Sequence, residues 1–172
     1  MPISTIGSDG LASSAVTRPK MGYSGAVLQV QSTTLTTMVT AAADTWTDIV
    51  SVSITPTSAS SKILIMFTTN FSASGNEVNA QVLRNGASIT GYTGGDVTNY
   101  GWTMGSQASI ASWGGQSASS QYLDSPASTS ALTYKLQAKQ NATTLYVNRS
   151  SGTTANDSQG GITTLTLMEI AG

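Results

Sequence analysis

The sequence contains no cysteine and no histidine. The lack of cysteine excludes disulfide bonds and thiolate metal sites. The lack of histidine removes the side chain that most often acts as a general base or binds a metal ion. We therefore expect no metal site, no cofactor and no catalytic residues, and the interpretation of the chain as a non-enzyme starts from these two absences.

Charge is also scarce, because Asp, Glu, Lys and Arg make up 9% of the chain and the net charge is −1, whereas a typical soluble domain has about 25% charged residues. Roughly three residues in ten are Ser or Thr. Binding to a nucleic-acid backbone requires clustered basic residues, and those of this chain are scattered. They are Arg18, Lys20, Lys62, Arg84, Lys135, Lys139 and Arg149. We expect no nucleic-acid partner, and the spacing of Lys135 and Lys139 on one strand predicts a solvated face.

Long hydrophobic runs are absent as well. The longest fully apolar run is Ile63 to Phe67, which is far shorter than the roughly 20 residues that span a bilayer. The first 14 residues, "MPISTIGSDGLASS", lack the basic region and the apolar region of a signal peptide. The sequence therefore predicts neither a membrane segment nor a secretion signal.

The chain has 172 residues, of which 39% are hydrophobic, and this is enough for one domain with a real core. Residues 1–25 differ from the remainder because their hydrophobic residues follow no steady period of 2 or 3.6. We predict an extended N-terminal arm that packs on another surface, although an unstructured terminus fits the pattern equally well. The candidate contact residues of this arm are Ile3, Ile6, Leu11, Val16 and Tyr23.

From residue 26 onward the chain has the pattern of β-strands. Alternation with a period of two is clear where Val50, Val52 and Ile54 are separated by serines, and we expect these three side chains to face the core. The same alternation in 131–139 places Leu132, Tyr134, Leu136 and Ala138 inward. The predicted strands lie within 26–32, 47–55, 62–69, 78–90, 131–139, 143–148 and 161–170.

The turns between these strands carry their own signals. Asn85-Gly86 between alternating arms is a strong signal for a β-hairpin, and the short link 140–142 predicts a second hairpin between 131–139 and 143–148. The run 62–69 is apolar at successive positions, which predicts a central strand covered on both faces. No segment has a convincing helical period, and residues 36–46 are interpreted as a strand and a turn. The fold class that we predict is all-β, an antiparallel β-sandwich or jelly-roll-like domain over residues 26–172.

Residues 91–126 interrupt this pattern, because they concentrate Gly, Ser and most of the aromatic side chains. We interpret the region as an insertion, either a long decorated loop or an elaborate hairpin with its own weak strands. Exposed aromatic rings are typical of carbohydrate or protein recognition surfaces. The alternative, which we favour, is that the two tryptophans close the end of the sandwich or a subunit contact. The candidate recognition residues are Tyr92, Tyr100, Trp102, Trp113 and Tyr122.

One pair of carboxylates is a candidate catalytic site. Asp44 and Asp48 lie four residues apart around Trp46, and glycoside hydrolases use two carboxylates about 5–9.5 Å apart. Any chain with eight acidic residues offers such a spacing, and a polar turn before a strand is the preferred interpretation. Asp124 and Asp157 match no calcium-binding loop and are interpreted as turn residues.

Four phrases of the sequence resemble a module of tailed-bacteriophage virion proteins, notably those of viruses of cyanobacteria. They are "VLQVQ" at 27–31, "TWTDI" at 45–49, "SITPTSASSKILI" at 53–65 and "LRNGASI" at 83–89. The closing part of the chain, "KLQAKQNATTLYVNRSSG" and "GITTLTLMEI" within 135–170, fits the same pattern. The resemblance covers about residues 25–170 and carries no catalytic residue.

The resemblance implies a β-sandwich in the virion, at the capsid exterior or the tail. Because only about 25 residues precede the module here, it is similar to a capsid decoration, or cement, protein that forms homotrimers and binds the major capsid protein. A tail-fibre or receptor-binding protein that recognises host surface glycans is the alternative. In the first case the arm residues would contact the capsid or a neighbouring subunit, and in the second the aromatic region would be the recognition loop.

Overall fold

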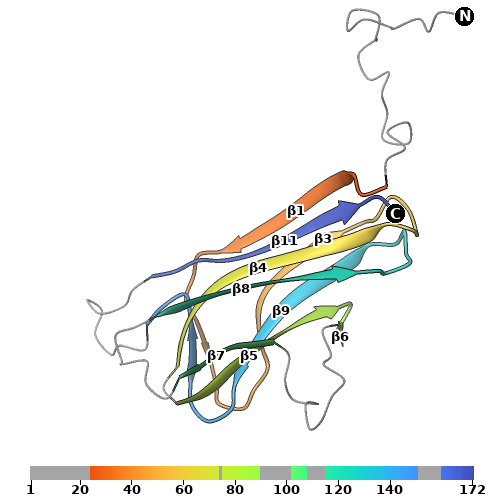
Figure 1. Ribbon diagram of the computed structural model, residues 1–172. Helices are drawn as coiled ribbons and strands as arrows, with labels where there is room; N and C mark the ends of the chain where they lie inside the picture. Colours follow the sequence, from red (N-terminus) through yellow and green to blue (C-terminus); the bar gives the residue numbers. More distant parts are fainter. Residues whose placement is uncertain (1–23, 74, 90–101, 108–114, 151–159) are drawn as a thin grey trace, which may run out of the picture.

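A computed structural model describes residues 24–73, 75–89, 102–107, 115–150 and 160–172 of the chain, and for 75–77 and 102–107 it describes the backbone alone. All regular structure in these residues is β-strand (Figure 1). None of them form a helix long and apolar enough to cross a membrane. The strands are β1 (Val27–Leu35), β2 (Val39–Ala41), β3 (Thr47–Ile54), β4 (Lys62–Ala73), β5 (Gly75–Arg84), β6 (Ala87–Ser88), β7 (Trp102–Gln107), β8 (Gln116–Asp124), β9 (Leu132–Gln140), β10 (Leu145–Val147) and β11 (Thr163–Ile170).

The strands form two antiparallel sheets that pack face to face, which confirms the predicted all-β sandwich. Sheet A has the order β1-β11-β4-β10-β2, with β8 paired to the free side of β4. Sheet B has the order β3-β9-β5-β6, with β7 paired to β5. The chain crosses from sheet A to sheet B between β4 and β5, which are consecutive strands. The jelly-roll path stays a prediction.

The core lies between the sheets and comes from alternate residues of the strands. Sheet A contributes Ile63, Ile65 and Phe67 of β4 with Leu165 and Leu167 of β11. Sheet B contributes Val50, Val52, Ile54, Val82, Leu132, Tyr134 and Leu136, all of them buried. The inward positions predicted for residues 50, 52 and 54 and for the strand 131–139 are therefore confirmed.

The Asn85-Gly86 hairpin is also confirmed. Leu83 pairs with Ser88 and Arg84 with Ala87, so two residues form the turn. Asn85 and Gly86 both have positive φ, 50° and 88°, as a type I′ turn requires. Glycine adopts this conformation without steric cost, which explains why the pair terminates β5 so sharply.

The second predicted hairpin is wrong. Strand β9 belongs to sheet B, whereas β10 pairs with β4 and β2 in sheet A. The link 141–144 therefore carries the chain across the sandwich. Gln140 accepts hydrogen bonds from the backbone amides of Ala142 and Thr143, so a buried side chain stabilises the bend in place of a hairpin turn.

The expectation that residues 62–69 are covered on both faces is corrected. Strand β4 is central in sheet A, but one of its faces is covered and the other, with Leu64 and Met66, is only half-buried. Within residues 91–126 the structure describes two strands, β7 in sheet B and β8 in sheet A, and each pairs with a strand from outside the region. The interpretation of the region as an insertion stays a prediction.

Candidate interaction surface

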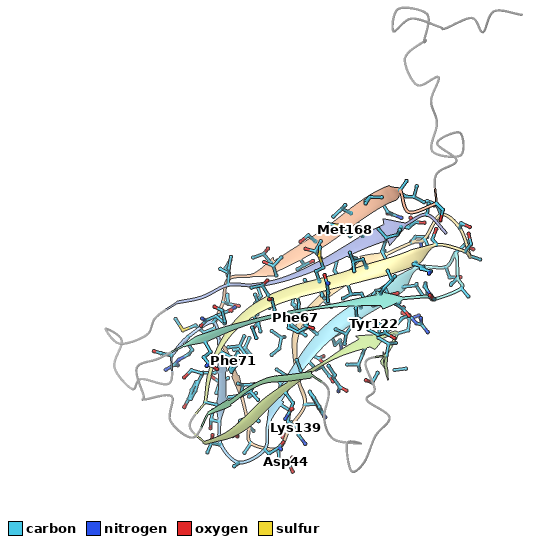
Figure 2. The ribbon with its side chains drawn as sticks, viewed as in Figure 1. Asp44, Phe67, Phe71, Tyr122, Lys139 and Met168 are labelled. Atoms are coloured by element: carbon cyan, nitrogen blue, oxygen red, sulfur yellow. The ribbon has the colours of Figure 1, made fainter. Side chains whose placement is uncertain are left out.

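The outer face of sheet A, which points away from sheet B, carries a row of apolar side chains. Cross-strand pairing aligns Val30 of β1 with Met168 of β11, Met168 with Leu64 of β4, and Leu64 with Leu123 of β8. Residues paired across antiparallel strands share one face of the sheet. These four residues, here called the apolar band, therefore cross four neighbouring strands. Figure 2 shows Met168 on β11, between β1 and β4.

The described residues leave the band open to a partner. Val30 is 49% exposed and Leu123 is 48% exposed, and they lie on the two edge strands of this part of sheet A. Leu64 and Met168 are half-buried, because neighbouring strands flank them on both sides. Val27, opposite Ile170, extends the apolar area toward the start of β1. A contiguous exposed apolar area on a folded domain marks an interaction site more often than isolated exposed residues do.

Beyond the band the outer face becomes hydroxyl-rich. The Ser32 and Thr166 hydroxyls lie 2.9 Å apart, and those of Thr34 and Thr164 lie 3.4 Å apart. An open hollow of about 470 Å³ lies on β4 and β8. Its lining residues are Met66, Phe67, Thr68, Ser119, Ser120 and Gln121. Of the described strand residues on this outer face, Lys62 at the start of β4 is the one that carries a charge.

The outer face of sheet B has the opposite character. Lys135 donates to Asp48 at 2.6 Å, Gln81 donates to Gln137 at 2.7 Å, and the Ser53 and Thr133 hydroxyls lie 2.8 Å apart. Gln137 also donates to Asp48, and the hydrogen bonds from Lys135 and Gln137 hold the pKa of Asp48 below its usual value. This polar face satisfies its own hydrogen bonds, so the two outer faces of the sandwich differ in what they offer a partner.

Asp44 and Asp48 form ion pairs with two different lysines. Asp48 pairs with Lys135, whereas Asp44 pairs with Lys139 at 2.8 Å (Figure 2). Asp44 has a φ of 54° and lies in the turn before β3, as the preferred interpretation expected. The prediction of a solvated face is wrong for Lys139, which is buried with its ammonium 5.8 Å from the centre of the Trp46 ring.

Asp124 is not a turn residue, because it ends strand β8 and is buried. Arg84 of β5 donates to both of its oxygens at 2.8 and 2.7 Å, and the Tyr134 hydroxyl of β9 donates to one of them at 2.7 Å. Burial and the bond to Asp124 both raise the pKa of Tyr134, so this hydroxyl stays a donor. The cluster connects sheet A to sheet B through three side chains.

A second buried carboxylate lies near the end of β11. Glu169 is fully buried and accepts from Gln29 at 2.6 Å and from the Thr57 amide and hydroxyl, both at 2.7 Å. Burial raises the pKa of Glu169, but the hydrogen bonds from Thr57 and Gln29 outweigh it and lower the pKa below its usual value. Glu169 therefore stays ionised and joins β1, β11 and the connection between β3 and β4.

The sequence-predicted contact residues fall largely outside the described part of the chain. All five arm residues lie outside it, as do Tyr92, Tyr100 and Trp113. Trp102 begins β7, where its backbone pairs with Ala80, but its side chain is outside the description. Tyr122 is 37% exposed on β8 (Figure 2). Both contact hypotheses therefore stay predictions.

Sequence reasoning missed the apolar band, although the signal was present. The run 62–69 is apolar at successive positions, and a second apolar face predicts a covering layer. Leu64 and Met66 instead lie on the outer face of sheet A. Val30, Met168 and Leu123 occupy the corresponding positions of three other strands, and only the register between strands brings them into line.

Among the described residues no group of three or more Asp or Glu side chains is placed to hold a metal ion. No family model matches the sequence, and no match to a curated protein was found. The candidate site is therefore defined by its own geometry, an uncharged apolar and hydroxyl surface on one side of the sandwich.

Proposed function

We propose that the chain is a non-enzymatic structural protein of a bacteriophage virion, a homotrimer that decorates and stabilises the capsid exterior. Two lines of support lead to this proposal. The first is the resemblance of the phrases at 27–31, 45–49, 53–65 and 83–89 to virion β-sandwich modules. The second is the outer face of sheet A, through which the protein would contact the major capsid protein.

The contrast between the two outer faces carries the proposal. Sheet B satisfies its outer polar groups with ion pairs and amide contacts. Sheet A presents the apolar band and a field of hydroxyls with almost no charge. A broad, uncharged surface suits contact with another protein. Burying it removes apolar area from water and leaves no charged group buried without a partner.

Trimerisation would strengthen attachment to the particle even if the affinity of each single face were weak. Three linked copies bind a surface with three matching sites by multivalency, so that weak contacts combine into a stable attachment. Stabilisation of the shell follows, since a ligand that binds only the assembled state shifts the equilibrium toward that state. A jelly-roll strand path belongs to the same proposal.

Charge placed on the apolar band tests the proposal. The variant Val30→Asp/Leu123→Asp should bind purified particles that lack the protein more than about a hundredfold more weakly, because burying an unpaired carboxylate costs several kcal/mol. Bound protein is measured by co-sedimentation with the particles. Both side chains are about half exposed, so the variant should keep its fold, which circular dichroism checks.

The matched control places the same two charges on sheet B. Ser51 and Ser53 are exposed on its outer face, and Ser51→Asp/Ser53→Asp should bind particles as the unmodified protein does. Equal loss in both variants, or unchanged binding in the sheet A variant, would contradict the proposal. If the sheet A variant binds particles normally but no longer adsorbs to host cells, the tail-fibre alternative is favoured.

A further inference from the structure

The chain enters the sandwich beside the apolar band. Gly25, with a φ of +91°, donates its amide to the carbonyl of Ala171 at 2.8 Å, and the Ala171 amide donates to Ala26 at 2.8 Å. These bonds fix the start of β1 against the end of β11. Val27, the first residue of β1, is 50% exposed on the outer face. The described chain therefore begins at the apolar end of that face, close to the C-terminus (Figure 1).

The 23 residues that precede this point are long enough to cross the face. Four neighbouring strands span three interstrand spacings of about 4.8 Å, or about 15 Å in total. An extended chain advances about 3.3 Å per residue, so about five residues cross the sheet. Val16 lies eight residues before Ser24 and Leu11 lies thirteen before it, which gives both side chains enough reach for every position of the band.

The composition of this segment matches the surface. Residues 1–23 contain four aliphatic side chains, Ile3, Ile6, Leu11 and Val16, among small and hydroxyl residues, and three charged residues, Asp9, Arg18 and Lys20. Their irregular spacing fits neither an amphipathic helix nor an alternating strand. The sequence of this segment gives no continuous apolar face, as a strand or an amphipathic helix would have. Its separate apolar side chains can still contact a flat apolar surface.

We propose that residues 1–23 of the same chain pack across the apolar band and cover it in the free protein. Attachment to Ser24 gives the segment a local concentration in the millimolar range at this face, which favours it over a second copy at ordinary protein concentration. Covering the band also protects a protein of net charge −1, because weak net charge combined with an exposed apolar surface promotes self-association. Particle binding would displace the segment.

The rate of methionine oxidation measures whether the outer face of sheet A is covered. Met66 and Met168 lie on the outer face of sheet A, whereas Met38 is 56% exposed between β1 and β2 and off the band. Oxidation turns the thioether into a polar sulfoxide at a rate that depends on exposure. Rates at the three sites are read by mass spectrometry under limiting hydrogen peroxide, with Met38 as the internal reference.

The unmodified chain is compared with a variant whose arm has lost its aliphatic side chains. We expect Met66 and Met168 to oxidise several-fold faster in the variant, while the rate at Met38 is unchanged. A control variant with four arm serines changed to glycine should behave as the unmodified chain. The two variants carry Ile3→Ser, Ile6→Ser, Leu11→Ser and Val16→Ser, or Ser4→Gly, Ser8→Gly, Ser13→Gly and Ser14→Gly.

Engineered disulfides identify the occupant, and the absence of native cysteine makes the result unambiguous. Val16→Cys/Met168→Cys should form a disulfide within one chain, whereas Val16→Cys/Ser51→Cys, with its second site on the outer face of sheet B, should stay reduced. A disulfide between chains, or protection of Met168 that increases with protein concentration, would overturn the proposal in favour of a second copy. Equal oxidation rates in all variants would overturn any role of the arm as a cover.

This inference deepens the proposed function, because it states what occupies the binding face before the protein meets a particle. The two can fail separately. Loss of particle binding in Val30→Asp/Leu123→Asp without arm-dependent protection would leave the function standing and remove the cover. If the arm protects Met66 and Met168 from oxidation but Val30→Asp/Leu123→Asp binds particles normally, the cover stands and the proposed function is removed.

Discussion

Replacing Asp124 with alanine should lower the free energy of unfolding by about 3 kcal/mol, because removing one partner of a buried ion pair leaves the other charge uncompensated. Asp124 is buried, and it accepts both hydrogen bonds of Arg84 and that of the Tyr134 hydroxyl. The side chain of Arg84 is 30% exposed, so water compensates part of the loss and the effect should not reach the upper end of the range for buried pairs. Urea unfolding followed by tryptophan fluorescence measures it.

Tyr134→Phe is the matched control for this prediction. It removes one neutral donor but keeps the ring in the core and the Arg84–Asp124 pair intact, and should cost about 1 kcal/mol. Arg84→Ala combined with Asp124→Ala should cost less than the sum of the two single changes, since each single change leaves a lone charge. Strict additivity would show that the pair does not join the two sheets energetically.

Glu169→Gln should lower the free energy of unfolding by about 2 kcal/mol, although it changes one atom. The carboxylate of Glu169 accepts from Gln29, from the Thr57 amide and from the Thr57 hydroxyl. Hydrogen bonds to a charged group are worth about 1.5–3 kcal/mol. A glutamine would bring its own two donors into a site that contains donors, so one N–H group would face another without an acceptor.

The same residue predicts a dependence on pH. The folded-state pKa of Glu169 lies below its ordinary value of 4.5, so its contribution to stability is complete above the unfolded-state pKa and is lost as the pH falls through the folded-state pKa. The midpoint of urea unfolding should therefore fall on acidification below about pH 5, and this fall should be smaller in Glu169→Gln. Asp48→Asn, at an exposed ion pair, should change stability by less than about 1 kcal/mol. Identical acid profiles for the unmodified chain and Glu169→Gln would contradict the assignment.

The sequence predicted those parts of the fold that depend on neighbouring residues. Alternation in β3 and β9 identified their buried faces, and Asn85-Gly86 identified the hairpin between β5 and β6, whose turn chemistry is local. It failed where the pairing is between distant strands. The separation of 131–139 from 143–148 into different sheets depends on the empty position beside β4 that β10 fills, and no short stretch encodes that.

The candidate site shows the same division. A run such as 62–69 reports that both faces of a strand are apolar, but not whether a second layer covers the outer one. The alignment of Val30 with Met168, and of Leu64 with Leu123, requires the register of three strand pairs. The isolated aspartate at 124 gave no hint of its partners, because Arg84 lies 40 residues earlier and reaches it only when the two sheets meet.

The pairing of β1 with β11 has a consequence for biosynthesis. Strand β1 pairs with β11, which is synthesised after the other described strands of sheet A. Strand β4 likewise lacks its main partner on that side until β11 leaves the ribosome. Sheet A should therefore complete its pairing only after β11 has left the ribosome, and folding should be slow, as is typical of folds dominated by contacts between distant residues. Until then the apolar strands stay unpaired, and incomplete chains should be prone to aggregate with one another.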